Sequence, residues 1–404
     1  GALAAWAILA KRTRRMTQNL DTMTMPEFLE ARYQSEHIKM ISAVIIFIFL
    51  LPYSASIFKG LGHLFESTFH ISFDFALIIL VVITGIYLVL GGYFAVTVTS
   101  FIQGIIMLVG AVIMICVLVY KAGGLTEAIT TVNTNYPEHV PVAQQPNWLT
   151  IASLIFMTSV GSWGLPQMVQ KFYAIKNEKV IPKAAIITTI FALVIGITAY
   201  GSGILSHVFF DNNTVPKMAN GGVNYDQIMP NLLAIKLPEA LLAIIMLLIL
   251  SASMSSLASL VLVSASSIAV DLYKGYLKKD VNEKTSLIIM RSFSVLFIFA
   301  TYLISKLQLG FIVTMQSLSW GVLSGAFLAP YVFAIYSKKV TKAAAYAGIY
   351  SGAGSAIILT MALGAANSAL AASIAIIVPF IVVPIVSAFT PKVDANVIEK
   401  AFKK

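Results

Sequence analysis

The sequence contains little charge and almost no cysteine. Only 11% of its 404 residues are Asp, Glu, Lys or Arg, 58% are hydrophobic, and its mean hydropathy is +0.88. So little charge excludes an ordinary soluble protein and is typical of a polytopic α-helical membrane protein. The longest polar stretches, about 122–147 and 210–231, are too short to form a core, so we expect one transmembrane domain over residues 1–404 and no soluble domain. The single cysteine, Cys116, excludes an intrachain disulfide.

Acidic residues are missing from the middle of every apolar run. Those that come nearest, all close to the end of a run, are Glu66, Asp74, Glu239 and Asp271. A proton relay across a membrane usually needs carboxylates or histidines inside it. The sequence also has no His-Glu-x-x-His motif, no phosphate-binding loop and no Cys/His cluster. We therefore expect that the protein is not an enzyme.

Apolar runs of about 20 residues predict ten membrane spans. They lie near residues 40–65, 75–91, 100–120, 149–167, 183–209, 238–271, 286–304, 308–337, 343–363 and 368–389. The runs at 238–271 and 308–337 are longer than one span needs, so they should tilt or bend. Mixed polarity with Pro26 near its start predicts a short surface helix at 24–33.

The basic residues predict an orientation. If the 11–39 loop is cytoplasmic, all but five of the 27 Lys and Arg residues fall on the cytoplasmic side. The five others are Lys59, Lys121, Lys217, Lys236 and Lys306. This asymmetry predicts a multi-pass protein of the plasma (inner) membrane with a cytoplasmic C-terminus. Because the basic residues are dispersed over successive loops without an aromatic platform, we expect the lipid bilayer, and no nucleic acid, as a partner.

Small residues form one face of the predicted helix at 249–259. Ala252, Ser255, Ser256 and Ser259 follow the spacing i, i+3, i+4 and i+7, which places them on the same side of a helix. One interpretation is a close helix–helix contact, because small residues let two backbones approach. The other is a cage of neutral oxygens for a small hard cation. Spacing alone favours the packing contact, which is the commoner use of such faces.

Polar groups in two other spans are candidates for a solute site. Lys59 lies with Tyr53 and Ser56 in the first predicted span. Its ammonium group either reaches the nearer membrane interface or provides a counter-charge for an anionic substrate such as a carboxylate. Gln316, in the 308–337 span, indicates either a cavity or one interhelical hydrogen bond.

The segment 161–170 contains two glycines and a proline within an apolar run. This pattern predicts a broken helix whose freed backbone groups line a cavity, with Trp163 and Gln167 as side chains of a solute site. An ordinary end of a span is the alternative, because Lys171 follows directly.

Several segments taken together resemble the sodium/solute symporter family, which includes carriers for proline, pantothenate, monocarboxylates, sugars and sialic acid. Residues 255–259, Ser-Ser-Leu-Ala-Ser, begin a segment that ends in Asp-Leu-Tyr at Tyr273 and is similar to one family motif. The segment 91–96, Gly-Gly-Tyr-Phe-Ala-Val, and its continuation to Gln103 resemble a second motif. Residues 163–176 resemble a third, which precedes a cytoplasmic loop. The resemblance covers essentially the whole chain.

The resemblance implies an all-α fold of two inverted five-helix repeats, of the leucine transporter class, around a mid-membrane site. It also implies that Na⁺ binds the Ser255 and Ser256 hydroxyls and the Ala252 carbonyl oxygen, which shifts the interpretation of that face to the cation cage. The family's first broken helix should lie before Gly1, so we expect the sequence to be incomplete at its N-terminus. Many members have Asp where this chain has Ser100, and that Asp contributes to a second sodium site; we therefore predict one sodium ion per cycle.

These observations predict a sodium-coupled secondary active symporter. It would import a small organic solute, such as a monocarboxylate, an amino acid or a similar carboxylate, by alternating access. The predicted solute-binding residues are Tyr53, Ser56, Lys59, Trp163, Gln167 and Gln316. The alternatives are a facilitated or proton-coupled solute carrier and, less favoured, a channel or a membrane sensor with the same fold.

Overall fold

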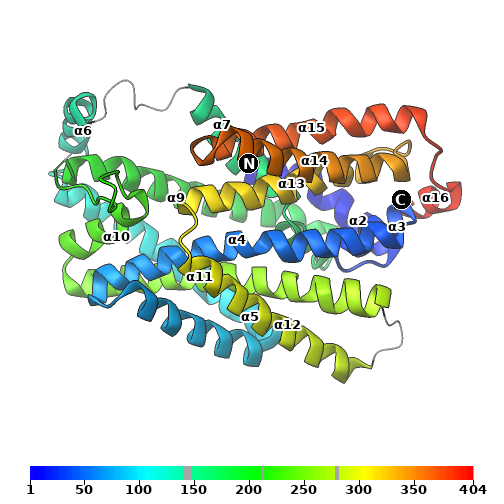
Figure 1. The fold of residues 1–404 in the computed structure, drawn as a ribbon, viewed down its shortest axis with the longest axis horizontal. Coiled ribbons are helices and arrows are strands. Elements are labelled where there is room, and N and C mark those ends of the chain that lie inside the picture. The colour runs from blue at the N-terminus through cyan, green and yellow to red at the C-terminus, as the bar shows by residue number, and fades with distance from the viewer. Residues whose placement is uncertain (140–147, 212, 278–281, 404) are drawn as a thin grey trace.

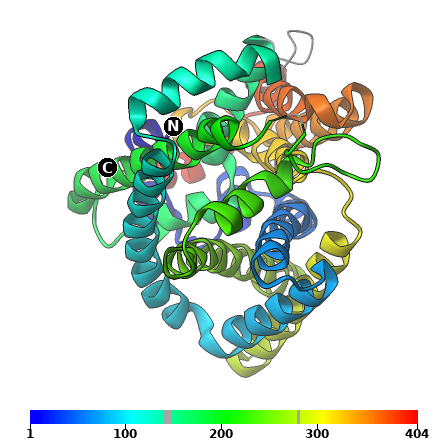
Figure 2. The ribbon, with the colours of Figure 1, turned by 90° about the vertical axis from the view of Figure 1, so that its left-hand side faces the viewer.

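The computed structural model describes residues 1–139, 148–211, 213–277 and 282–403, and within these ranges it leaves out the side chains of 89–97, 135–139, 276 and 283. Most of the helices run along one long axis (Figure 1) and are seen end-on in Figure 2. The glycine-rich motif at 91–96 falls among the residues whose side chains are not described.

The first half of the chain forms a helical N-terminal segment, two long helices and a broken one. In order these are α1 (Ala2–Ala5), η1 (Trp6–Ala10), α2 (Lys11–Leu20), α3 (Met25–Tyr33), α4 (Glu36–Phe69), α5 (Phe73–Lys121), α6 (Leu125–His139), α7 (Trp148–Val160), η3 (Gly161–Gly164), α8 (Pro166–Tyr173) and η4 (Glu178–Val180). The second half continues with α9 (Ile181–Phe209), α10 (Tyr225–Lys236), α11 (Glu239–Ser266), η5 (Ser267–Leu277), α12 (Glu283–Lys306), α13 (Ile312–Tyr336), α14 (Lys342–Leu363), η6 (Ala365–Asn367), α15 (Ser368–Phe389) and α16 (Ala395–Ala401).

The helices agree with the predicted spans. Among the described residues, eight helices are long and apolar enough to cross a membrane, and a ninth span is added if the bent pair Trp148–Gly164 and Pro166–Tyr173 is counted as one. The predicted span at 75–91 corresponds to a shorter apolar helix, Phe73–Leu88. The helix predicted at 24–33 is confirmed as α3, but its predicted surface position is wrong, because most of its side chains are buried against the rest of the protein.

Helix α5 does not run straight along its 49 residues. Residues 87 and 99 would be about 18 Å apart along a straight helix. Yet the hydroxyl groups of Tyr87 and Thr99 form a hydrogen bond. The helix therefore bends between them, and the parts before and after the bend, Phe73–Leu88 and Val98–Lys121, each match one predicted span.

Helix α13 is the central helix, and α9 faces the lipid. In the most apolar window of α13, 78% of the residues are buried inside the protein, compared with 11% for α9. The exposed residues of α9 are large and aliphatic, such as Ile186, Ile190 and Leu193. Such a surface is stable only where lipid, and not water, surrounds it.

The short helix α3 is fastened across one end of α13. It starts with a capping box: the Thr24 hydroxyl accepts a hydrogen bond from the Glu27 amide, and the Glu27 carboxylate accepts one from the Thr24 amide. The Arg32 guanidinium is fully buried and donates to the carbonyl oxygens of Ala334 (3.1 Å) and Ser337 (2.8 Å). Burial lowers the pKa of Arg32 below its usual value. These carbonyls are the ones that the end of a helix leaves unpaired.

Candidate functional site

A cavity of about 580 Å³ lies between α4, α10, α11 and α13. Three of the predicted solute-binding residues line it, namely Tyr53, Ser56 and Gln316. Ala252 and Ser256, two of the three predicted sodium ligands, line the same cavity. Tertiary folding thus places candidate ion ligands and candidate solute ligands, which come from three different helices, around one space.

The hydroxyl groups of α11 point to two different neighbours. Ser256 is exposed and borders the cavity. Ser255 is half-buried and donates a hydrogen bond to Ser100 of α5, with 3.2 Å between the two Oγ atoms. Ser259 donates to the Ser255 carbonyl oxygen within the helix. Neutral oxygens of this kind suit a small hard cation. No group of three or more His, Cys, Asp or Glu that could hold a metal ion occurs in the described ranges.

Tyr53 connects the cavity to the broken helix through Trp320. The two rings pack edge to face, with 5.7 Å between their centroids. Trp320 also lies against the break, because a Cβ added to Gly161 would come within 3.8 Å of its ring. Ser56 donates to the Tyr53 carbonyl oxygen at 2.6 Å, as hydroxyls commonly do within membrane helices.

Lys59 is paired with an acidic residue of the α10 segment. Its Nζ lies 2.7 Å from Oδ2 of Asp226 and 2.8 Å from the Gly310 carbonyl oxygen. Both side chains are buried, with 7% and 6% of their surface exposed. Asp226 also accepts a hydrogen bond from the Ile312 amide in the first turn of α13, where a negative charge is favoured by the helix dipole. This pair therefore joins α4, α10 and α13 beside the cavity.

The break predicted at 161–170 is confirmed. The helix segments before and after it meet at 46°. Leu165 is extended, as expected for a residue that precedes proline. The Gly161 carbonyl oxygen, freed by the break, accepts a hydrogen bond from Ser324 of α13. Trp163 and Gln167 stand outside the lining of the cavity around Tyr53, and Trp163 Nε1 and Gln167 Oε1 have no hydrogen-bond partner among the described residues.

Asp226 and Trp320 are site residues that the sequence analysis did not select. Asp226 belongs to the stretch 210–231, which reads as a polar loop. A buried lysine requires a partner, and that requirement is the signal that could have pointed to an acidic residue on the outer side. It did not distinguish Asp226 from other acids such as Glu66.

A sequence model of the sodium:solute symporter family matches residues 1–352. The chain belongs to that family. This symporter is 27% identical over 363 residues to the sodium/proline symporter of Salmonella typhimurium. The matched region covers 89% of this chain and 72% of that protein. It is 28% identical over 364 residues to sodium/proline symporter 2 of Staphylococcus saprophyticus, with 87% and 69% covered.

A solved structure shares the fold. The substrate-bound outward-open state of a Na⁺-coupled sialic acid symporter matches with a TM-score of 0.77 and 18% identity, over 97% of this chain and 83% of that one. The predicted all-α inverted-repeat fold is thereby confirmed. As a member of the sodium:solute symporter family, the protein is a multi-pass membrane protein that couples solute transport to sodium, and Na⁺ is its co-transported ion. Its named relatives are transporters.

Proposed function

We propose that this symporter imports a small organic solute with a carboxylate group, such as an amino acid or a monocarboxylate, together with one sodium ion per cycle. The observation that carries the proposal is the shared cavity, because Ala252 and Ser256 line the same space as Tyr53 and Gln316. An ion on this wall orders the surface that the solute contacts. The sodium/proline symporters among the relatives support an amino acid as the solute.

Sodium would bind first, at Ala252, Ser255 and Ser256, and favour the outward-open state. It shifts the equilibrium only as far as it prefers that state to the inward-open one, and the inward sodium gradient then drives uptake. The proposal of one sodium ion per cycle depends on the identity of residue 100, which is Ser. This residue offers Ser255 a hydroxyl group at 3.2 Å where many family members have a carboxylate.

The solute would contact Tyr53, Ser56 and Gln316 from the cavity. Trp163 and Gln167 would join from the broken helix, where unpartnered Trp163 Nε1 and Gln167 Oε1 are available for hydrogen bonds. Lys59 would attract the solute carboxylate. Because its ammonium group already contacts Asp226, the solute carboxylate would compete with or replace the side chain of Asp226.

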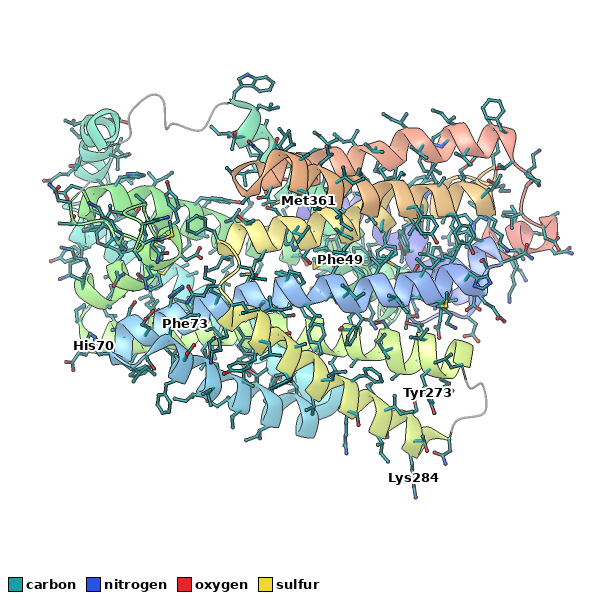
Figure 3. The ribbon with its side chains drawn as sticks, viewed as in Figure 1. Phe49, His70, Phe73, Tyr273, Lys284 and Met361 are labelled. Atoms are coloured by element: carbon teal, nitrogen blue, oxygen red, sulfur yellow. The ribbon has the colours of Figure 1, made fainter. Side chains whose placement is uncertain are left out.

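We also propose that the C-terminus is cytoplasmic in the plasma (inner) membrane. His70 and Phe73 lie at one end of the bundle, and Tyr273 and Lys284 lie at the other (Figure 3). Helix α16, labelled in Figure 1, lies at the end of the bundle where Figure 3 labels Lys284. The loops at that end are rich in Lys and Arg, which is the pattern of cytoplasmic loops.

The sodium site is tested by thermal unfolding of the full chain in detergent, in sodium and in potassium at equal ionic strength. We expect a sodium-specific rise of the melting temperature, equivalent to about 2.7 kcal/mol at a concentration 100 times the Kd. The double variant Ser255→Ala/Ser256→Ala should lose this rise. Ser259→Ala is the control, because its hydroxyl bonds only within α11 in the described structure. If wild-type protein responds equally to both ions, a proton-coupled or facilitated carrier becomes the better interpretation.

The role of Lys59 is tested by comparing Lys59→Met with Asp226→Asn. Each variant leaves one buried polar group without its charged partner, and breaking a buried pair costs about 3–5 kcal/mol. If Lys59 binds the solute, Asp226→Asn should retain carboxylate-dependent uptake and Lys59→Met should lose it. The double variant Lys59→Met/Asp226→Asn removes both charges, restores part of the stability, and should still fail to take up the carboxylate. Equal uptake by the wild type and the double variant would contradict the proposed role.

A further inference from the structure

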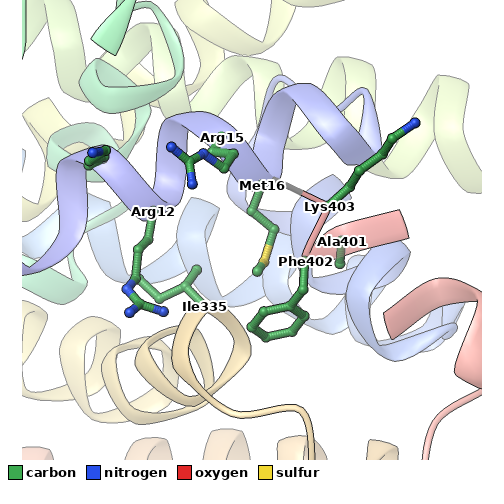
Figure 4. A pocket seen from close by; sticks show the side chains of 8 residues that line it. Arg12, Arg15, Met16, Ile335, Ala401, Phe402 and Lys403 are labelled. Carbon is green, nitrogen blue, oxygen red and sulfur yellow. The ribbon is translucent and has the colours of Figure 1, made fainter. Parts of the chain in front are cut away.

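A second cavity, which we call the basic pocket, lies far from the solute site. It has a volume of about 300 Å³ and lies between α2, the end of α13 and the segment that follows α16. Lys11, Arg12 and Arg15 line it from α2, and Lys403 lines it from the C-terminal segment (Figure 4). Met16 and Phe402 provide apolar surface between them. The lining of the pocket thus combines four basic side chains with apolar surface.

Only part of this positive charge is neutralised. Arg15 forms two hydrogen bonds with the Glu178 carboxylate, at 2.9 and 3.0 Å, and Lys11 lies 3.7 Å from it. Within the described part of the chain, neither Arg12 nor Lys403 forms an ion pair. The Arg12 guanidinium instead lies over the Tyr336 ring, 4.1 Å from its centroid. Glu178 therefore pairs with two of the four basic side chains, and the charges of Arg12 and Lys403 remain to attract a further anion.

The pocket lies at the level of the membrane surface. Tyr336, at the end of the α13 span, is 42% exposed and donates to the Ile8 carbonyl oxygen at 2.7 Å. Exposed tyrosines at span ends are typical of the membrane interface. A neighbouring cavity of about 500 Å³ shares Phe402 and Lys403 with the pocket and adds two basic residues, Lys338 and Lys400, and one acidic residue, Glu399. The cationic surface is therefore large enough for a headgroup and continues along the interface.

We propose that the basic pocket binds the phosphate group of an anionic phospholipid from the cytoplasmic leaflet. This inference rests on the orientation proposed above and not on the solute. The Arg12 guanidinium binds the phosphate, the start of an acyl chain contacts Met16 and Phe402, and Lys403 adds positive charge on the far side of these two side chains (Figure 4). Basic pockets between membrane helices on the cytoplasmic side suit such headgroups. The apolar interior distinguishes a lipid from free phosphate, which makes no use of it.

A bound lipid would also fasten the C-terminal segment to the helical core. Asn19 of α2 already donates to the carbonyl oxygens of Ala401 (3.2 Å) and Lys403 (2.9 Å). A lipid whose phosphate binds Arg12 and whose acyl chain lies on Phe402 joins the same two elements. We therefore expect lipid binding to raise the melting temperature of the full chain.

The test measures the melting temperature of the full chain in detergent as short-chain phosphatidylglycerol is added. Parallel titrations use short-chain phosphatidylcholine and inorganic phosphate. We expect phosphatidylglycerol alone to stabilise the wild type. In Arg12→Gln/Lys403→Gln, half-maximal stabilisation should require about 25-fold more phosphatidylglycerol, from about fivefold for each basic residue near a membrane surface. The control Lys176→Gln/Lys284→Gln removes the same charge from exposed positions outside the pocket and should titrate as wild type.

Lys403→Gln alone provides a variant that cannot fail for reasons of folding, because this side chain is exposed at the end of the described chain. It should weaken the response about fivefold. Equal responses of the Arg12/Lys403 and Lys176/Lys284 variants would overturn the proposal. Equal stabilisation of the wild type by inorganic phosphate would overturn the assignment to a lipid. An unchanged sodium response in the Arg12/Lys403 variant would show that the pocket acts separately from the ion site.

Discussion

Two helices of this symporter carry faces of small residues, and each face has a different role. On α13, Gly325 is pressed against two other helices, so that an added Cβ would lie 3.0 Å from the carbonyl oxygens of Ala375 and Gly352. On α11, Ala252 and Ser256 border a cavity of about 580 Å³. The face on α13 brings helix backbones into close contact, whereas the face on α11 borders a cavity.

The comparison shows what a small-residue pattern leaves undecided. Glycine and alanine permit close approach of helices, whereas serine brings an oxygen that has to be partnered in lipid. Ser255 finds this partner in Ser100 of α5, and Ser256 faces the cavity. The spacing of small residues on α11 favoured a close helix–helix contact. In the structure, such a contact is seen at Gly325 of α13. The following predictions test this division.

Among the predictions for these two faces, the largest effect on stability is expected at the seam between α13 and α14. In Gly352→Ala, the new Cβ would lie 2.8 Å from the Ala326 amide nitrogen and closer still to Gly325. Overpacking of this kind costs about 1–3 kcal/mol. Gly354→Ala, on the same helix, is the matched control because its Cβ meets nothing within 4 Å, and it should be neutral or stabilising by up to about 1 kcal/mol. If the melting temperature fell equally in both variants, close packing at Gly352 would not be the cause of the loss of stability.

A bulky residue on the α11 face should spare the fold and abolish the function. Ser256→Leu places its side chain in the cavity, so we expect a stability change within about 1 kcal/mol, in contrast to the effect at Gly352. Sodium-specific stabilisation and sodium-driven uptake should both be lost. The measurements are melting temperature in sodium and in potassium, and uptake into proteoliposomes. Retained uptake would show that Ser256 contacts neither ion nor solute.

The smallest effect on stability is expected at Ser100. Ser100→Asp introduces a carboxylate beside Ser255, where a second sodium ion would find an anionic ligand. The sodium dependence of uptake should become steeper, with a Hill coefficient rising from about 1 toward 2. Ser100→Asn is the control of similar size without charge. A Hill coefficient near 2 in the wild type would contradict the prediction of one ion per cycle.

Much of the fold was predictable because lipid imposes a simple rule. A helix that satisfies its own backbone in lipid needs about 20 apolar residues, so the runs in the sequence mark the helices directly. The break before Lys171 was predictable for a similar reason, since two glycines and a proline cannot continue a regular helix. The family motifs then predicted the inverted-repeat fold and sodium as the coupling ion.

The sequence by itself determined the helices, the break, the family and the small-residue face of α11, since each depends on residues close together along the chain. Only the tertiary structure decided that Lys59 pairs with Asp226, that Ser255 meets Ser100, and that Trp320 connects Tyr53 to the broken helix. The physical reason is separation: these partners lie on different elements, and no local spacing encodes which helices pack together. A charge or hydroxyl group in an apolar run predicts that a partner exists, and the packing of the helices determines which residue that partner is.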